Sequence, residues 1–201
     1  MKKLSTVLMS FLVIINVLLC FRVLQQNKQI NLFTSDNESK EELLMLISFI
    51  LENSNRQINP FQELKIEGDT STLRFLDLVT QPKLFFYYNE LSCDPCSDIE
   101  LDKLDSISNI IGSENVFLLS KNSSFKDIYL LRRINSFRFR VALVDELINL
   151  PISNYPSNYY FVLDSNYVIK LFFVPVRKNQ DLNELYYSQI IKQFDKVPVG
   201  T

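Results

Sequence analysis

The chain of 201 residues contains no histidine, no tryptophan and only three glycines. The absence of histidine excludes Ser-His and Cys-His catalytic pairs, histidine general bases and histidine metal ligands. The few glycines form no P-loop and no dinucleotide-binding fingerprint, which argues against a phosphate-binding loop. A net charge of −2 with dispersed basic residues gives no support for a nucleic-acid partner. Cysteine chemistry is what these absences leave.

Two of the three cysteines, Cys93 and Cys96, stand three positions apart behind the aromatic run of residues 85–88. A helical pattern follows them, and its spacing predicts one buried face made of Ile99, Leu101, Leu104, Ile107 and Ile110. The two thiols can meet in a disulfide if the first helical turn brings them together. The N–H groups and positive dipole end of that turn favour a thiolate on Cys93. A strand, a C-x-x-C pair and a helix in this order are typical of thioredoxin-like redox sites.

The N-terminus has the composition of a membrane segment. Lys2 and Lys3 precede 18 uncharged residues, 4–21, and Val23 and Leu24 extend the apolar stretch beyond Arg22. About 20 apolar residues span a bilayer as a helix. No small-residue cleavage site follows, so residues 4–24 predict an uncleaved anchor rather than a signal peptide. The alternative is a lipoprotein modified on Cys20, although Leu18 and Leu19 stand where such signals have a small residue.

The lysines before the apolar segment place its N-terminus on the cytoplasmic side, so the rest of the chain is exported. Disulfides persist in such a compartment. We expect three regions: an anchor over 1–24, a linker with a helix over 25–59, and one domain over 60–201.

Within that domain, buried strands are expected to alternate with helices and to end in a hairpin around the turn Asp164-Ser165-Asn166. Residues 73–79 are ambiguous. The pattern predicts an α/β fold with a mixed sheet covered on both faces. The expected strands are 83–88, 115–120, 138–143, 158–163 and 167–174, and the later helices are 126–133 and 183–194.

Three features together resemble the thioredoxin fold: the junction of the strand with Cys93-Asp94-Pro95-Cys96, the helix after it, and the late hairpin at residues 159–164. The resemblance covers residues 60–195 and is closest to membrane-anchored thioredoxin-like proteins of bacterial envelopes, of the TlpA or redoxin type. It implies that Cys93 attacks a substrate disulfide and that Cys96 resolves the mixed disulfide. Pro95 stands where many members also have proline.

The same resemblance implies a single-pass protein of the bacterial inner membrane with its domain on the periplasmic side. The implied partners are envelope proteins carrying thiols or disulfides, together with an electron donor that the sequence does not identify. No cofactor and no metal are expected beyond the protein's own dithiol.

The chain also differs from that family. Ser92 stands where a tryptophan often precedes the first cysteine. The family's cis-proline before the hairpin strand falls on Asn158, and the nearest proline is Pro156. Either an insertion lets Pro156 take this role or the feature is absent. Four acidic residues near the motif should raise the pKa of the Cys93 thiol, which favours a reducing or weakly reactive site. They are Glu90, Asp94, Asp98 and Glu100.

Several other readings compete with thiol exchange. A purely structural disulfide gains little here, because a C-x-x-C loop closes few residues. A structural zinc site needs about four Cys or His ligands, and this chain has three cysteines and no histidine. Thioredoxin-like peroxidases resemble one another in a proline and a threonine or serine ahead of the attacking cysteine, and Phe86 and Glu90 occupy those positions. A non-catalytic thioredoxin-like module that binds a partner protein stays as the alternative function.

Arginines are densest at Arg132, Arg133, Arg138 and Arg140. This patch is compatible with anionic lipid or an acidic partner, but we expect a solvated helix face.

Overall fold

The computed structural model describes residues 43–68, 72–89, 96–121, 124–145, 147, 158–176 and 179–195. The chain divides into two units, Met1–Ile47 and Ser48–Thr201. Residues 43–47 of the first unit are helical, and in the second unit the helix continues over 48–53. The expected anchor and Cys20 lie outside the described residues, among which no helix is long and apolar enough to cross a membrane. The anchor and the domain boundaries stay predictions.

One seven-stranded mixed sheet forms the centre of the second unit, with the strand order β2-β1-β5-β4-β3-β6-β7. β3, β4 and β5 are parallel, β6 is antiparallel to β3, and β7 is antiparallel to β6. The strand that leads to the cysteine pair, β3, therefore lies inside the sheet with a neighbour on each side. The strands are β1 (Glu63–Ile66), β2 (Thr72–Arg74), β3 (Lys83–Asn89), β4 (Val116–Lys121), β5 (Arg140–Leu143), β6 (Tyr159–Leu163) and β7 (Ile169–Phe173).

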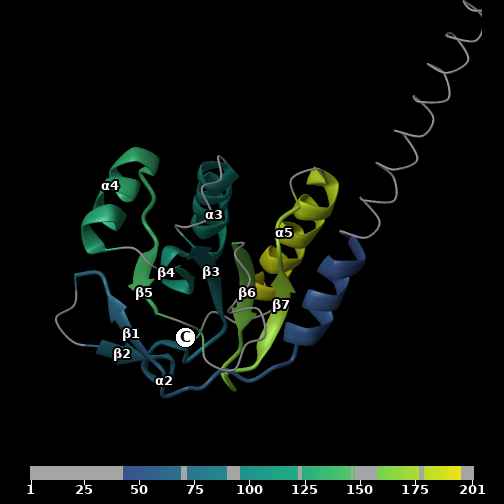
Figure 1. Cartoon of the computed structure of the whole chain (residues 1–201), viewed down its shortest axis with the longest axis horizontal. Helices are drawn as coiled ribbons and strands as arrows, with labels where there is room; N and C mark the ends of the chain where they lie inside the picture. The colour runs from purple at the N-terminus through teal and green to yellow at the C-terminus, as the bar shows by residue number, and fades with distance from the viewer. Residues whose placement is uncertain are drawn as a thin grey trace, which may run out of the picture. The chain divides into compact units, whose positions relative to one another are not determined.

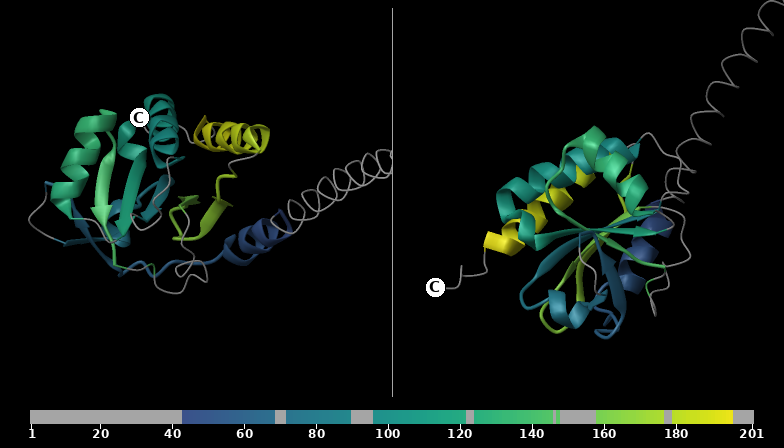
Figure 2. Two further views of the ribbon diagram at one scale, coloured as in Figure 1. Left: turned by 45° about the horizontal axis from the view of Figure 1, so that its top comes forward. Right: turned by 90° about the vertical axis from the view of Figure 1, so that its left-hand side faces the viewer.

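Three long helices cover one face of this sheet and the short helix α2 lies on the other, as the right-hand view of Figure 2 shows. Their buried apolar residues form one cluster with the inward residues of β3, β4 and β6. On the other face the ring of Phe85 packs against the rings of Phe75, Phe117 and Phe161, at 5.2–5.5 Å between centroids. The helices are α2 (Phe75–Leu78), α3 (Cys96–Ile111), α4 (Phe125–Asn135) and α5 (Gln180–Asp195), with a short 3-10 turn at Ser113–Asn115.

Local sequence signals fix several element ends. Ser124 caps α4, accepting a hydrogen bond from the Asp127 backbone N–H, while the Asp127 carboxylate accepts one from the Ser124 N–H in return. In the hairpin between β6 and β7, the Asp164 carboxylate accepts hydrogen bonds from the N–H groups of Asn166 and Val168. Such a side chain replaces the missing backbone partner of a tight turn. The expected hairpin is confirmed.

The predicted buried face of α3 is wrong in two of its five positions. Leu101, Leu104 and Ile107 are buried, but Ile99 and Ile110 are exposed. Eleven residues are about three helical turns, so Ile99 and Ile110 share one side of the helix, opposite the buried side. Glu100 lies in line with Leu104 and Ile107 instead and is buried.

The first hairpin was not predicted. β1 and β2 pair antiparallel at one edge of the sheet, and the ambiguous stretch 73–79 divides into the end of β2 and α2. Their sequences, Glu-Leu-Lys-Ile and Thr-Leu-Arg, are short and half polar, because each strand is only partly covered. The other expected strands and helices are present, with no end shifted by more than three residues.

Candidate functional site

The structure describes both sides of the cysteine motif but not the motif itself. β3 ends at Asn89, and α3 begins at Cys96. Cys93 and Pro95 lie outside the described residues, as do Glu90 and Asp94. The setting expected from the sequence, a buried strand followed by a helix that starts at the second cysteine, is present (Figure 1). The attacking and resolving roles of Cys93 and Cys96 stay predictions.

Asn158 lies beside the strand that leads to the motif. Its side-chain Oδ1 accepts a hydrogen bond of 2.9 Å from the backbone N–H of Asn89. The register pairs Tyr87 with Tyr159, so Asn158 falls at the end of the β3–β6 ladder. The structure thus brings Asn158 to the end of β3, four residues before Cys93. Pro156 and the peptide bond that precedes Asn158 lie outside the described residues, so the cis-proline question stays open.

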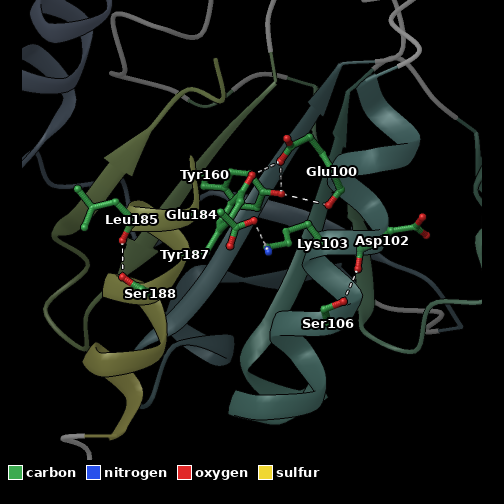
Figure 3. A network of polar contacts seen from close by, with 9 residues as sticks. All are labelled: Glu100, Asp102, Lys103, Ser106, Tyr160, Glu184, Leu185, Tyr187 and Ser188. Carbon is green, nitrogen blue, oxygen red and sulfur yellow. Dashed lines mark hydrogen bonds and ion pairs between the residues drawn. The ribbon is translucent and has the colours of Figure 1, made fainter. Parts of the chain in front are cut away.

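A buried carboxyl group, which the apolar pattern of the sequence did not predict, lies on α3. Glu100 Oε2 accepts hydrogen bonds from the hydroxyl groups of Tyr160 on β6 and Tyr187 on α5, both at 2.7 Å. The Tyr160 hydroxyl also lies 3.1 Å from the backbone carbonyl oxygen of Glu100. Figure 3 shows the carboxyl group held between the two phenols, where α3 faces β6 and α5.

Charged residues close the outer side of this cluster. Lys103 Nζ lies 2.6 Å from a carboxylate oxygen of Glu184 and 5.0 Å from the centre of the Tyr187 ring. The ion pair joins α3 to α5 next to the cluster formed by Glu100 and the two tyrosines (Figure 3). Exposed pairs of this kind contribute little stability, up to about 1 kcal/mol.

Burial raises the pKa of the Glu100 carboxyl group above its ordinary value. The hydrogen bonds from Tyr187 and Tyr160 favour the ionised form and oppose this shift, but burial is the larger effect. Burial also raises the pKa values of the Tyr160 and Tyr187 phenols, which therefore act as neutral donors. Glu100 is an acid whose proton is held more tightly than in water, so it can gain or lose a proton nearer neutrality than an exposed glutamate.

Glu100 is also close to the motif along the helix. It follows Cys96 by four residues, so the two positions lie on the same side of α3, one turn apart. The signal for Glu100 was its position in line with Leu104 and Ile107, but the apolar pattern favoured Ile99 on that face instead. Glu100 was expected to add negative charge near Cys93; the structure turns its side chain toward Tyr160 and Tyr187.

Among the residues that the structure describes, no three His, Cys, Asp or Glu side chains are grouped so that they could hold a metal ion. The metal-free dithiol chemistry expected from the sequence stays a prediction, because Cys93 lies outside that part of the chain.

Comparison with known proteins identifies the architecture. No family model and no curated protein sequence matches the chain. Among solved structures, a protein from Chlorobium tepidum assigned as thiol:disulfide interchange protein DsbE has a TM-score of 0.50 at 13% identity, covering 69% of this chain and 99% of its own. The fold is thioredoxin-like. This confirms the fold expected from the junction, the helix and the hairpin.

Other solved structures with this fold are also redox proteins. A protein from Bacteroides thetaiotaomicron assigned as a disulfide isomerase has a TM-score of 0.53 at 7% identity, with 70% of this chain and 87% of its own covered. A cysteine mutant of peroxiredoxin Q from Xanthomonas campestris has a TM-score of 0.50 at 10% identity, with 70% and 98% covered. The chain is thus structurally similar to thiol–disulfide oxidoreductases and to peroxiredoxins.

Proposed function

We propose that this chain is a thiol–disulfide oxidoreductase of the bacterial envelope, anchored in the inner membrane by residues 4–24. The observation that carries the proposal is the junction between β3 and α3: a C-x-x-C pair bridges a central strand and the first residue of a helix in a thioredoxin-like sheet. Cys93 is the attacking thiol and Cys96 the resolving thiol. The partners are envelope proteins with exchangeable disulfides or thiols.

The proposed exchange has two steps. The Cys93 thiolate attacks one sulfur of a substrate disulfide, which breaks that S–S bond, forms a mixed disulfide and releases the first substrate thiolate. The Cys96 thiolate then attacks the Cys93 sulfur, which releases the second substrate thiolate and leaves a Cys93–Cys96 disulfide. The substrate gains two electrons and the protein dithiol loses them. A separate dithiol donor must then reduce the protein; the reverse sequence oxidises a substrate.

The surroundings of α3 affect the first step in opposite ways. The start of the helix stabilises a thiolate through its free N–H groups and dipole. A negative charge on Glu100, one turn further along, opposes a thiolate, whereas a protonated Glu100 does not. A protonated Glu100 should therefore leave a larger thiolate fraction at the motif than an ionised Glu100.

Peroxide reduction is less well supported, although a peroxiredoxin shares the fold. Phe86 and Glu90 occupy the positions of the proline and the threonine or serine that thioredoxin-like peroxidases place before the attacking cysteine. Phe86 is a buried residue of β3. A non-catalytic binding module stays as the second candidate, because Ser92 and Asn158 replace the family's tryptophan and proline.

The test is the reduction potential of the cysteine pair in the full chain carrying Cys20→Ser, so that only two thiols are present. The protein is equilibrated in glutathione or dithiothreitol buffers and read by thiol alkylation. A reversible couple between about −120 and −270 mV supports exchange. Thiols that never react, or a disulfide that no buffer reduces, refute the proposal and favour the binding module.

A trapping experiment separates the two cysteines. Cys96→Ser leaves the attacking thiol without its partner, so mixed disulfides with substrate should accumulate. Cys93→Ser is the matched control and should trap nothing. Trapping by Cys93→Ser rather than by Cys96→Ser would reverse the assigned roles.

A further inference from the structure

The outward side of α4 combines large apolar side chains with basic ones. Ile134 is 76% exposed and Tyr129 61% exposed, and Leu130 and Phe125 are also exposed. Single exposed apolar residues are ordinary, but four within one 11-residue helix indicate a surface that binds another protein or a membrane. Two exposed basic residues, Lys126 and Arg133, lie on the same side of the helix as these four apolar residues. We call the six residues together the α4 surface: Phe125, Lys126, Tyr129, Leu130, Arg133 and Ile134.

The α4 surface is separate from the side of the helix that packs on the domain. Ile128 is the buried residue of α4. One turn later, Arg132 turns inward, donates hydrogen bonds to the carbonyl oxygens of Phe137 and Phe139, and pairs with Glu67. α4 is the end helix of the row α4, α3, α5, so no described helix covers its outer side (Figure 1). The domain does not need these apolar side chains for its core.

Basic residues outnumber acidic ones around α4. Six basic residues and one acidic residue lie between positions 116 and 143, a formal excess of five positive charges in a chain whose net charge is −2. The one acidic residue, Asp127, is bound at the helix cap by Ser124, and Arg132 is paired with Glu67. Among the described residues neither Lys126 nor Arg133 forms an ion pair. Their charges are available to an external anion.

We propose that the α4 surface docks onto the anionic lipid surface of a membrane. A basic helix with aromatic and aliphatic side chains is the type of element that lies in the lipid headgroup region. The stems of Lys126 and Arg133 lie alongside the apolar residues while their charged ends reach lipid phosphates. The expected membrane anchor, residues 4–24, which is apolar with one charged residue at Arg22, supplies the second argument and rests on the function proposed above. A chain tethered at a bilayer presents its surface to the lipid at high effective concentration. Docking would hold the domain against the membrane, whereas without docking only the linker would connect the domain to the anchor.

The absence of tryptophan makes this measurable in the full chain. Tyr129→Trp places one fluorophore on the α4 surface. Ile110→Trp is the matched control, because Ile110 is also 61% exposed but lies on α3. Each variant is reconstituted into phosphatidylcholine vesicles with or without phosphatidylglycerol, and quenching by brominated acyl chains is recorded.

We expect the tryptophan of Tyr129→Trp to be quenched and blue-shifted when phosphatidylglycerol is present and that of Ile110→Trp to stay unquenched. Adding Lys126→Gln and Arg133→Gln should lower the ratio of docked to undocked domain roughly 25-fold, since each basic residue at an anionic surface strengthens association about fivefold. Equal quenching of both tryptophans would mean mere proximity through the tether and would overturn the proposal. No quenching of Tyr129→Trp would also overturn it and leave the surface to an acidic protein.

Discussion

Glu100 is a buried acidic residue of α3. Its carboxyl group accepts hydrogen bonds from the phenols of Tyr160 on β6 and Tyr187 on α5. Its charged form loses hydration that the hydrogen bonds from Tyr160 and Tyr187 replace only in part. Ionising a buried acid with a raised pKa lowers the free energy of unfolding of the protein. Stability and reactivity should therefore both depend on its protonation.

The stability of the domain should fall as Glu100 ionises. Because the pKa of Glu100 in the folded protein lies above its unfolded value of about 4.5, the native state binds the proton more tightly. This contribution is complete below the unfolded pKa and is lost as pH rises through the folded pKa. Glu100→Gln removes it, so the stability of that variant relative to wild type should increase from pH 4 to pH 8. Urea unfolding of both proteins across this range measures the difference.

Tyr187→Phe is the opposing control. Losing the hydroxyl removes a hydrogen bond that favours ionised Glu100, so the decline with pH should shift to higher pH and become larger. Parallel stability curves for the wild type and both variants would show that Glu100 does not titrate differently in the native and unfolded states.

Asn158 should contribute to stability through its side-chain oxygen. Asn158→Ala removes the acceptor for the Asn89 N–H at the end of β3, which should lower the free energy of unfolding by about 1 kcal/mol. Asn158→Asp keeps an oxygen in place and should lose less. An alanine variant as stable as wild type, measured by urea denaturation, would rule out this role for the amide.

At the scale of elements, α3 allows a test with one residue type. Ile107 is buried in the core cluster and Ile110, three positions later, is exposed. Ile107→Ala should cost roughly 2–5 kcal/mol of unfolding free energy, as for other buried aliphatic truncations. Ile110→Ala should change it by less than about 0.5 kcal/mol. Equal losses of unfolding free energy would indicate that Ile110 is buried as well, as the sequence pattern predicted.

The elements that could be predicted are those whose apolar pattern is set by burial alone. β3, β4 and β6 are buried and each contains an unbroken run of four or five apolar or aromatic residues. The β6–β7 turn carries its own Asp164 signal. α3 was predicted but with the wrong face, because Ile99 and Ile110 are apolar yet exposed, and Glu100 is acidic yet buried. Hydrogen bonds from Tyr160 and Tyr187, which lie 60 and 87 positions further along the chain, reduce the free-energy cost of burying Glu100. A pattern of neighbouring residues carries no information about partners so distant in sequence.

At the scale of the whole molecule, Phe85 connects segments far apart in the chain. Its ring packs on Phe75 of α2, Phe117 of β4 and Phe161 of β6. Phe85→Ala should cost about 3–5 kcal/mol, a large share of the 5–15 kcal/mol that stabilises an ordinary domain. We expect a strongly lowered melting temperature by circular dichroism. Phe125→Ala, on the exposed side of α4, should melt close to wild type; similar losses in both would refute the difference.

The pairing of β3 with β6 has a consequence for the order in which the protein is made. Tyr87 pairs with Tyr159, so about 70 residues separate the strand before the cysteines from the strand that completes its ladder. At roughly 5–20 residues per second, several seconds pass during synthesis before β6 exists. Throughout that interval Cys93 and Cys96 belong to a nascent chain whose sheet cannot yet close. A disulfide between neighbours in sequence needs no closed sheet, so the proposed Cys93–Cys96 disulfide requires none of the later strands in order to form.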